Sequence, residues 1–254
     1  MALSFLRLFL YLAMLLNAAP LKAAAPPPQS GITLHATRVI YPESAKKGVT
    51  LSLTNNNEHA YLMQSWIRPL DLSSGQAAAE VQGADDPTNT IPFIATPPLK
   101  RVNAGEKMTL LIRQTRNDLP NDRESVFAVS VKAIPSMPAK TEQTGNQLVI
   151  ALVNNFKLFY RPAGLPAGGI TQAANELHFS RQGDRLIVDN PTPFYLTFSH
   201  LTVGGSAVEP AELRLMVPPK GQQHYRLPKA ANGDVQWQLL DENTEATPMQ
   251  RQPL

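Results

Sequence analysis

Arg38 and Lys157 are the residues whose side chains and surroundings best suit a chemical role. Arg38 continues an alternating row of apolar residues in an extended stretch, so strict alternation directs its guanidinium to their face (Ile32, Leu34 and Ala36). Lys157 lies between Phe156 and Leu158, with no acidic residue nearby in the sequence. An unpaired cation among apolar groups is costly, so each needs a counter-charge from elsewhere in the chain or from a ligand. Two such cations predict a site for an anion, such as a carboxylate or a phosphate.

Each cation also has a plainer interpretation. A kink near Thr37 would release Arg38 to solvent, where most isolated arginines lie. Lys157 shares its parity with Val153, but a bulge at Asn154–Asn155 would exchange the face to which it points. The sequence leaves both alternatives open.

No other group of residues has the spacing of a catalytic or metal site. The five histidines are scattered, and the sequence contains no nucleophile elbow, phosphate-binding loop or dinucleotide-binding motif. The absence of cysteine excludes thiol chemistry and cysteine-based zinc sites. We therefore expect no catalytic residue, no metal and no cofactor, and an exported hydrolase is disfavoured.

Residues 1–25 have the features of a secretory signal peptide, with a basic start, an apolar segment and a small-residue end (Arg7, Leu8–Leu16 and Ala23–Ala25). The apolar segment is short for a membrane span, so an uncleaved anchor is the weaker alternative. Removing residues 1–25 takes away Arg7 and Lys22 and no acidic residue, so the formal charge falls from +3 to +1. So small a charge does not predict nucleic-acid binding, and we expect no membrane span in the mature chain.

The mature chain of about 230 residues is long enough for two domains. Residues 26–160 contain seven strand-like segments separated by turn residues, which predict an immunoglobulin-like sandwich: Ile32–Tyr41, Thr50–Thr54, Leu62–Arg68, Ile91–Ala95, Met108–Arg113, Ser125–Ile134 and Gln147–Tyr160. Residues 161–169 are dense in proline and glycine and predict a linker. Residues 170–254 predict a smaller β-sandwich with strands at Leu177–Ser180, Arg185–Asp189, Tyr195–Leu201, Arg214–Val217, Gln222–Leu227 and Val235–Leu240.

The segment QLVIALVNNFKLFYRP, residues 147–162, is unusual because both of its strand faces are apolar. Leu148, Ile150 and Leu152 lie on one face, and the three intervening residues make the other face apolar too. Such a strand is either central in a sandwich or keeps one face for a partner.

Several segments together resemble the periplasmic pilus chaperones of the chaperone–usher pathway. QLVIALVNNFKLFYRP resembles a long strand of that family with a KLFYRP-type end, ATRVIYP its first strand with an arginine, and LPNDRESVFAVSVKAIP its signature around DRES. TPPLKRVNAG at 96–105 and DNPTPFYLTF at 189–198 also fit. The departures are Ala128 and Ser130, where the family usually has an aromatic residue and Asn, and the missing glycine after LLDEN.

This resemblance implies an all-β protein of two immunoglobulin-like domains set at an angle, with a cleft between them. It implies that Arg38 and Lys157 bind the C-terminal carboxylate of a pilus subunit. Leu148, Ile150 and Leu152 would be the alternating side chains of a strand that is lent to the subunit, while the opposite face packs on the chaperone's own domain.

The resemblance further implies an ion network of Glu124, Arg161 and Asp241 that joins the domains. It implies a periplasmic location, delivery of subunits to an outer-membrane usher, and no cofactor. A pilus subunit is the disfavoured alternative, because subunits usually carry a cysteine pair and one domain. An exported immunoglobulin-like adhesin or ligand-binding module is the other, but it would not need two cations flanking a donor-type strand.

Overall fold

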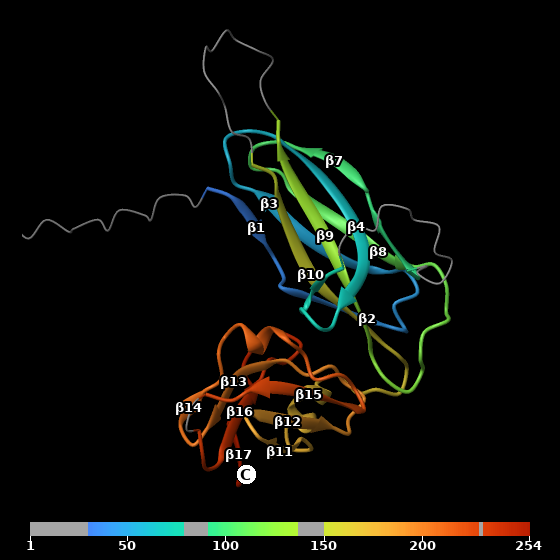
Figure 1. The fold of residues 1–254 in the computed structure, drawn as a ribbon. Coiled ribbons are helices and arrows are strands. Elements are labelled where there is room, and N and C mark those ends of the chain that lie inside the picture. Colours follow the sequence, from blue (N-terminus) through green and yellow to red (C-terminus); the bar gives the residue numbers. More distant parts are fainter. Residues whose placement is uncertain (1–29, 79–90, 137–149, 229–230) are drawn as a thin grey trace, which may run out of the picture.

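The chain folds into two lobes built from strands, which confirms the predicted all-β, two-domain architecture (Figure 1). The computed structural model describes residues 30–78, 91–136, 150–228 and 231–254. Strands β1–β10 form the first lobe and β11–β17 the second. Within these ranges, no helix has the length and apolarity needed to cross a membrane. The predicted signal peptide lies outside the described residues.

Two sheets face each other in the first domain. One has the strand order β1 (Ile32–Leu34), β3 (Val49–Asn55), β8 (Lys107–Gln114) and β6 (Phe93–Thr96). The other has the order β2 (Arg38–Pro42), β10 (Leu152–Arg161), β9 (Ser125–Pro135), β4 (Tyr61–Asp71) and β5 (Gln76–Ala77), and β7 (Leu99–Val102) also pairs with β4. Leu53 and Leu110 from the first sheet pack in one buried cluster with Val131 and Leu158 from the second.

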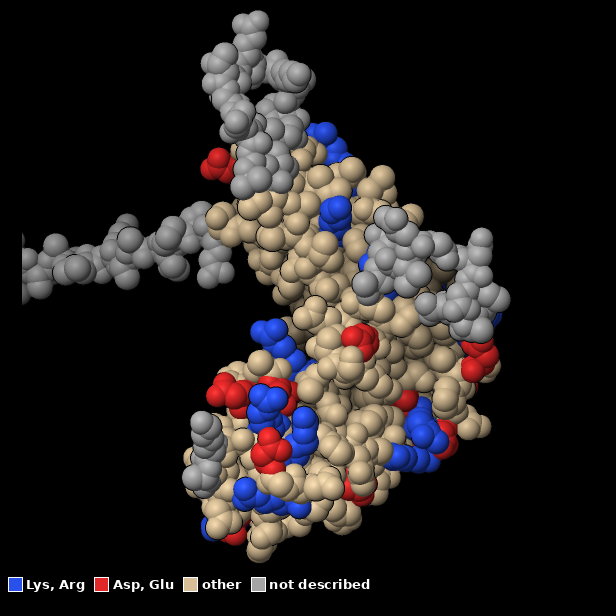
Figure 2. All heavy atoms as spheres, viewed as in Figure 1, with Lys and Arg blue, Asp and Glu red and all other residues tan. Residues whose placement is uncertain are grey.

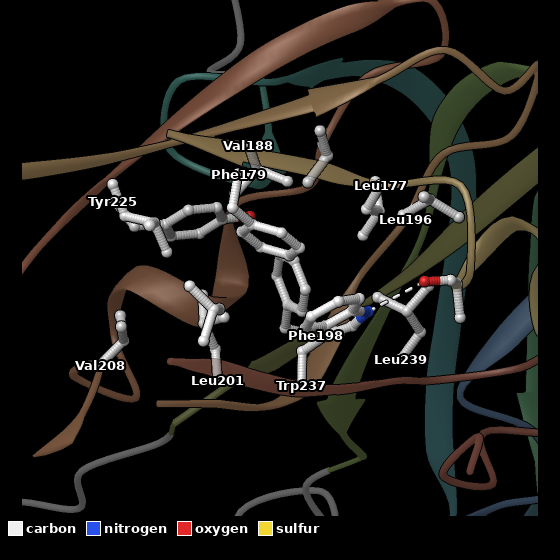
Figure 3. Packing of buried hydrophobic residues seen from close by; sticks show 14 of the residues in the cluster. Leu177, Phe179, Val188, Leu196, Phe198, Leu201, Val208, Tyr225, Trp237 and Leu239 are labelled. Carbon is white, nitrogen blue, oxygen red and sulfur yellow. Dashed lines mark hydrogen bonds between the residues drawn. The ribbon is translucent and has the colours of Figure 1, made fainter. Parts of the chain in front are cut away.

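The second domain has a core of its own, which is rich in aromatic side chains (Figure 3). One sheet contains β11 (His178–Gln182), β12 (Arg185–Asn190) and β15 (Gly221–Arg226); the other contains β14 (Ser206–Ala207), β13 (Phe198–Val203), β16 (Val235–Leu239) and β17 (Gln250–Gln252). The ring of Phe179 lies 4.4 Å from that of Trp237 between centroids. The indole N–H of Trp237 donates to the carbonyl of Ala174 at 3.1 Å, so the buried ring leaves no unpaired donor.

The predicted strand Ile32–Tyr41 is in fact two strands in different sheets. β1 pairs with β3 in one sheet, whereas β2 pairs with β10 in the other. The chain therefore crosses between the layers at residues 35–37, which is close to the kink that the sequence left open at Thr37. Because β1 and β2 belong to different sheets, the alternation that begins at Ile32 does not determine the direction of the Arg38 side chain.

Other differences lie at the ends and edges of the domains. The predicted strand Arg214–Val217 is wrong, since Arg214 ends the 3-10 helix η1 (Glu212–Arg214) and Val217 makes only an isolated bridge with Leu196. β10 runs through Arg161, into the predicted linker, and the short helix α2 (Gly169–Ala173) closes it. The predicted domain limits at 160 and 170 stay predictions. The short edge strands β7 and β17 had no clear alternation in the sequence.

Candidate functional site

Arg38 and Lys157 lie side by side on neighbouring strands. β2 and β10 are parallel, and Lys157 and Arg38 are register partners. Val39 of β2 and Leu158 of β10 belong to the core of the first domain. Because side chains alternate along a strand, both cations project from the opposite, outer face of the sheet. Sequence-distant residues thus form the compact cationic pair that the sequence suggested.

The second domain supplies the nearest hydrogen-bond acceptors for this pair. The guanidinium of Arg38 donates to the carbonyl oxygens of Leu240 at 3.3 Å and Asp241 at 2.9 Å. The ammonium of Lys157 donates to the carbonyl of Arg214 at 3.5 Å. Among the described residues, no carboxylate lies within 4.0 Å of either cation. Neutral carbonyl groups satisfy some N–H donors but do not cancel the two positive charges.

Burial makes these charges costly. It lowers the pKa of Lys157 from its ordinary 10.5 to about 8, and the nearby positive charge of Arg38 adds to the effect. Burial also lowers the pKa of Arg38, against the pull of the carboxylates of Asp241, Glu242 and Glu124. A bound anion would relieve both effects, because an opposite charge favours the charged form of each group.

The two plainer interpretations of these cations are not borne out. The chain does kink before Arg38, but the side chain turns toward the second domain instead of into solvent. β10 pairs with β9 without a register shift from Leu152 to Tyr160, so no bulge occurs at Asn154–Asn155. Lys157 therefore keeps the parity of Val153.

The junction between the domains contains an open cavity beside Arg38. A cavity of about 430 Å³ is lined by Ala36 and Arg38 of the first domain and by Glu242 and Thr244 of the second. Figure 2 shows a notch between the lobes, with both basic and acidic side chains beside it. The cavity leaves room for a ligand group to approach the guanidinium.

The apolar end of β10 is exposed next to this pair. Ile150 and Leu152 are 61% and 63% exposed, and Leu148 lies outside the described residues. β2 covers β10 only from Lys157 onward, so the other edge of β10 before Lys157 has no strand partner among the described residues. An uncovered apolar strand edge can accept a further strand.

The structure corrects the predicted faces of this strand. Leu152 has the parity of Phe156 and Leu158, which point into the domain's own core. Val153, predicted to pack on its own domain, is 47% exposed on the outer face. Leu152 is exposed because β10 extends beyond the core, and not because it faces away from it.

Arg161 joins the two domains through two carboxylates. Its Nε and Nη2 donate to Glu124 Oε1 at 2.9 and 2.8 Å, and its Nη1 donates to Glu242 Oε1 at 2.8 Å. The Arg161 side chain is 6% exposed and that of Glu124 1%. The other oxygen of Glu124 accepts the backbone N–H of Tyr195 at 2.9 Å. Burial raises the pKa of Glu124, although Arg161 opposes that rise.

Asp241 is not the third member of this network, contrary to the prediction; Glu242 takes that place. The side chain of Asp241 instead accepts the backbone N–H groups of Asn243 and Glu245, both at 2.8 Å. This turn has Thr244 at φ 68, a left-handed conformation that glycine adopts more easily. The carboxylate of Asp241 is therefore hydrogen-bonded within its own turn, and the longer side chain of Glu242 reaches Arg161.

Further contacts between the domains were not foreseen. The ammonium of Lys220 donates to the carboxylate of Asp122 at 2.6 Å. Gly75, at the tip of the β4–β5 hairpin, lies so close to η1 that a Cβ there would be 2.7 Å from the Arg214 carbonyl oxygen. No sequence signal could pair such distant residues. In the part of the chain that the structure covers, no group of three or more acidic or histidine side chains could hold a metal ion.

Comparisons with known proteins agree with this architecture. Residues 31–166 match the family model for the PapD N-terminal domain of pili and flagellar-assembly chaperones, and residues 172–247 match the C-terminal domain of the pili assembly chaperone PapD. The chaperone protein FimC of Escherichia coli is 40% identical over 222 residues, which are 87% of this chain and 83% of FimC. The chain belongs to the pilus-assembly chaperone family.

Other chaperones show the same relationship. FimB/FhaD of Bordetella pertussis is 33% identical over 241 residues, covering 92% of this chain and 93% of that protein. The periplasmic chaperone SfaE has a TM-score of 0.66 and 35% identity over 87% of this chain and 98% of its own. A chain in the Salmonella enterica complex of the SafA pilin with the SafB chaperone has a TM-score of 0.73 and 29% identity, covering 89% of this chain and 97% of that one. The family is one of chaperones and not of enzymes.

Proposed function

We propose that this chaperone binds a pilus subunit by holding its C-terminal carboxylate with Arg38 and Lys157 and by lending it the exposed part of β10. The observation that carries the proposal is the half-buried pair of register partners, which no carboxylate of the described residues contacts within 4.0 Å. A carboxylate can accept charge-assisted hydrogen bonds from both cations at once. The location of this pair at the point where β2 stops covering β10 would set the register of the added strand.

The exposed side chains of β10 suit strand addition. A subunit strand laid along the uncovered edge would receive backbone hydrogen bonds from β10 and cover Ile150 and Leu152. Burying each side chain is worth about 1.5–3 kcal/mol before the cost of ordering. We propose that Leu148 makes the third contact of the same face.

The remaining parts of the proposal concern the cell and the whole protein. We propose that the chain is exported to the periplasm after removal of residues 1–25, that it passes its subunit to an outer-membrane usher, and that it acts without catalysis or cofactor. The Glu124–Arg161–Glu242 contacts support a further role, in which the ion network keeps the two domains at the angle that holds the cleft open.

The test is co-expression with a pilus subunit followed by co-purification. Arg38→Ala should reduce the recovered complex to background, because a buried carboxylate would lose one charged partner at a cost of about 2–5 kcal/mol. Arg113→Ala is the matched control, since Arg113 lies exposed on β8 in the opposite sheet. The free Arg38→Ala protein should remain folded. Recovery of the complex at the control level would reject Arg38 as an anchor.

A further inference from the structure

The outer face of the six-stranded sheet carries rows of polar and cationic side chains beside the anchor pair. In one row, Arg68 of β4 is opposite Ala128 of β9, which is opposite Lys157 of β10, which is opposite Arg38 of β2. The next row toward the open end of β10 contains Trp66, Ser130 and Asn155, and the one after it Gln64, Lys132 and Val153. The cationic character of the anchor therefore continues across this face.

A hollow of about 570 Å³ lies over these two rows. Its lining includes Trp66, Lys132 and Asn155, and no aspartate or glutamate of the described residues lines it. The Oγ of Ser130 donates to Asn155 Oδ1 at 2.6 Å, so the amide NH₂ of Asn155 remains available as a donor. Lys132 makes no ion pair with any of the residues that the structure describes.

The indole N–H of Trp66 is buried and has no hydrogen-bond partner among the residues that the structure describes. A buried donor without a partner is costly, and such an exception calls for an explanation. The guanidinium of Arg68 stacks 5.1 Å from the centroid of the same ring, which holds the indole in place. Among the described residues, the hollow thus offers the N–H donors of Asn155 and the charge of Lys132 with no acid in its lining, which is the chemistry that recognises a carboxylate.

The hollow is continuous with the strand that the proposed function assigns to the subunit. Val153 and Asn155 line it, and both lie in the part of β10 that β2 leaves uncovered. A strand added to that edge would place a side chain about 5 Å from Asn155 on the same face. A glutamate there would extend toward Lys132, which is diagonal to Asn155 across β9 and β10.

We propose that this hollow is a second recognition site for the subunit and that it accepts an acidic side chain of the segment paired with β10. The inference rests on the proposed function, since it needs the subunit strand to lie along β10. It adds a specificity determinant. The anchor pair binds the terminal carboxylate, which every chain has, whereas the hollow binds an acidic side chain within the subunit's sequence. Subunits with an acid at this position would be preferred.

The test uses synthetic twelve-residue peptides of alternating valine and serine with a free C-terminal carboxylate. Each peptide carries a single glutamate at one of its last six positions, and each has a twin with glutamine there. Trp66 borders the hollow, whereas Trp237 is sealed in the other domain's core, so binding can be followed by the tryptophan fluorescence of the intact chaperone. At one position the glutamate peptide should bind about tenfold more tightly than its twin, as expected for a charge-assisted hydrogen bond.

Substitutions in the chaperone connect this preference to the hollow. Lys132→Gln should abolish the preference, whereas Lys132→Arg should keep it. Lys107→Gln, on an exposed lysine of the opposite sheet, should leave it unchanged. An equal preference in the wild type and Lys132→Gln, or none in the wild type, would overturn the proposal.

The Arg38→Ala chaperone separates this inference from the proposed function. If Arg38→Ala binds neither peptide while the wild type binds both twins equally, the anchor stands and the hollow is not a recognition site. If Arg38→Ala binds both peptides as the wild type does, the anchor fails. A third outcome would also reject the proposal: Lys132→Gln is less stable than the wild type, and the wild type shows no preference for the glutamate peptides. The hollow would then bind an acidic segment of this chain and not the subunit.

Discussion

Replacing Lys157 with methionine should stabilise the free chaperone and at the same time abolish its binding of a subunit. Methionine keeps the length of the lysine stem but carries no charge. The folded state bears a cost for the half-buried ammonium, because burial lowers the pKa of Lys157 from 10.5 to about 8. Each pKa unit corresponds to about 1.36 kcal/mol, so this cost is at most about 3 kcal/mol when the lysine is charged in both states, since solvent screens part of it. The weak contact with the Arg214 carbonyl offsets little of it.

The pH dependence gives this prediction a sharp signature. Below about pH 8, Lys157 is protonated in both the folded and the unfolded state, and the full cost is present. Between pH 8 and 10.5 the unfolded state binds more protons, so the wild type gains stability as the pH rises. The advantage of Lys157→Met should therefore be constant below pH 8 and disappear toward pH 10.5. Subunit affinity of the wild type should fall above pH 8, where the free lysine loses its charge.

Urea unfolding of the two proteins from pH 6 to 10.5 measures this difference, because all other titrating groups are shared and cancel. Lys107→Met, at an exposed site on β8, should change stability by less than about 0.5 kcal/mol. Co-purification with a subunit measures the second effect. A Lys157→Met chaperone that is less stable than the wild type at pH 7, or a difference independent of pH, would refute the electrostatic argument.

Two further substitutions test the strand and the ion network. Leu152→Glu should leave the chaperone soluble and folded but reduce the recovered subunit complex to background, since it forces a charge into an apolar groove; circular dichroism checks the fold, and a loss of fold would show that Leu152 is needed by the chaperone's own core. Glu242→Gln should lower the free energy of unfolding by about 1–3 kcal/mol, because Arg161 would keep only one charged partner. Asp241→Asn should be nearly neutral in the same urea titration, since an amide oxygen can still cap the turn; an equal loss in both variants would restore Asp241 to the network.

Much of the architecture could be predicted from the residues alone. Alternation of apolar residues and turn signals located most of the central strands, because strand periodicity is a local property of the chain. The predicted strand boundaries were wrong where tertiary context overrides this periodicity. The chain at residues 35–37 changes sheets, and residues 214–217 form a turn of 3-10 helix followed by a single bridge. A local pattern cannot tell a strand that continues from one that crosses to the facing layer.

The sequence by itself determined that Arg38 and Lys157 are unusual, because each is a cation in an apolar stretch without an acidic neighbour. Only the tertiary structure decided that they are register partners, that carbonyls of the second domain accept their hydrogen bonds, and that no bulge turns Lys157 away. The tertiary structure also determined that Glu242, and not its neighbour Asp241, forms the ion pair with Arg161. Residue type and the alternation of side chains along a strand are local properties of the sequence. Which distant residues come close together depends on sheet register, and on the few ångströms by which one turn changes the reach of a side chain.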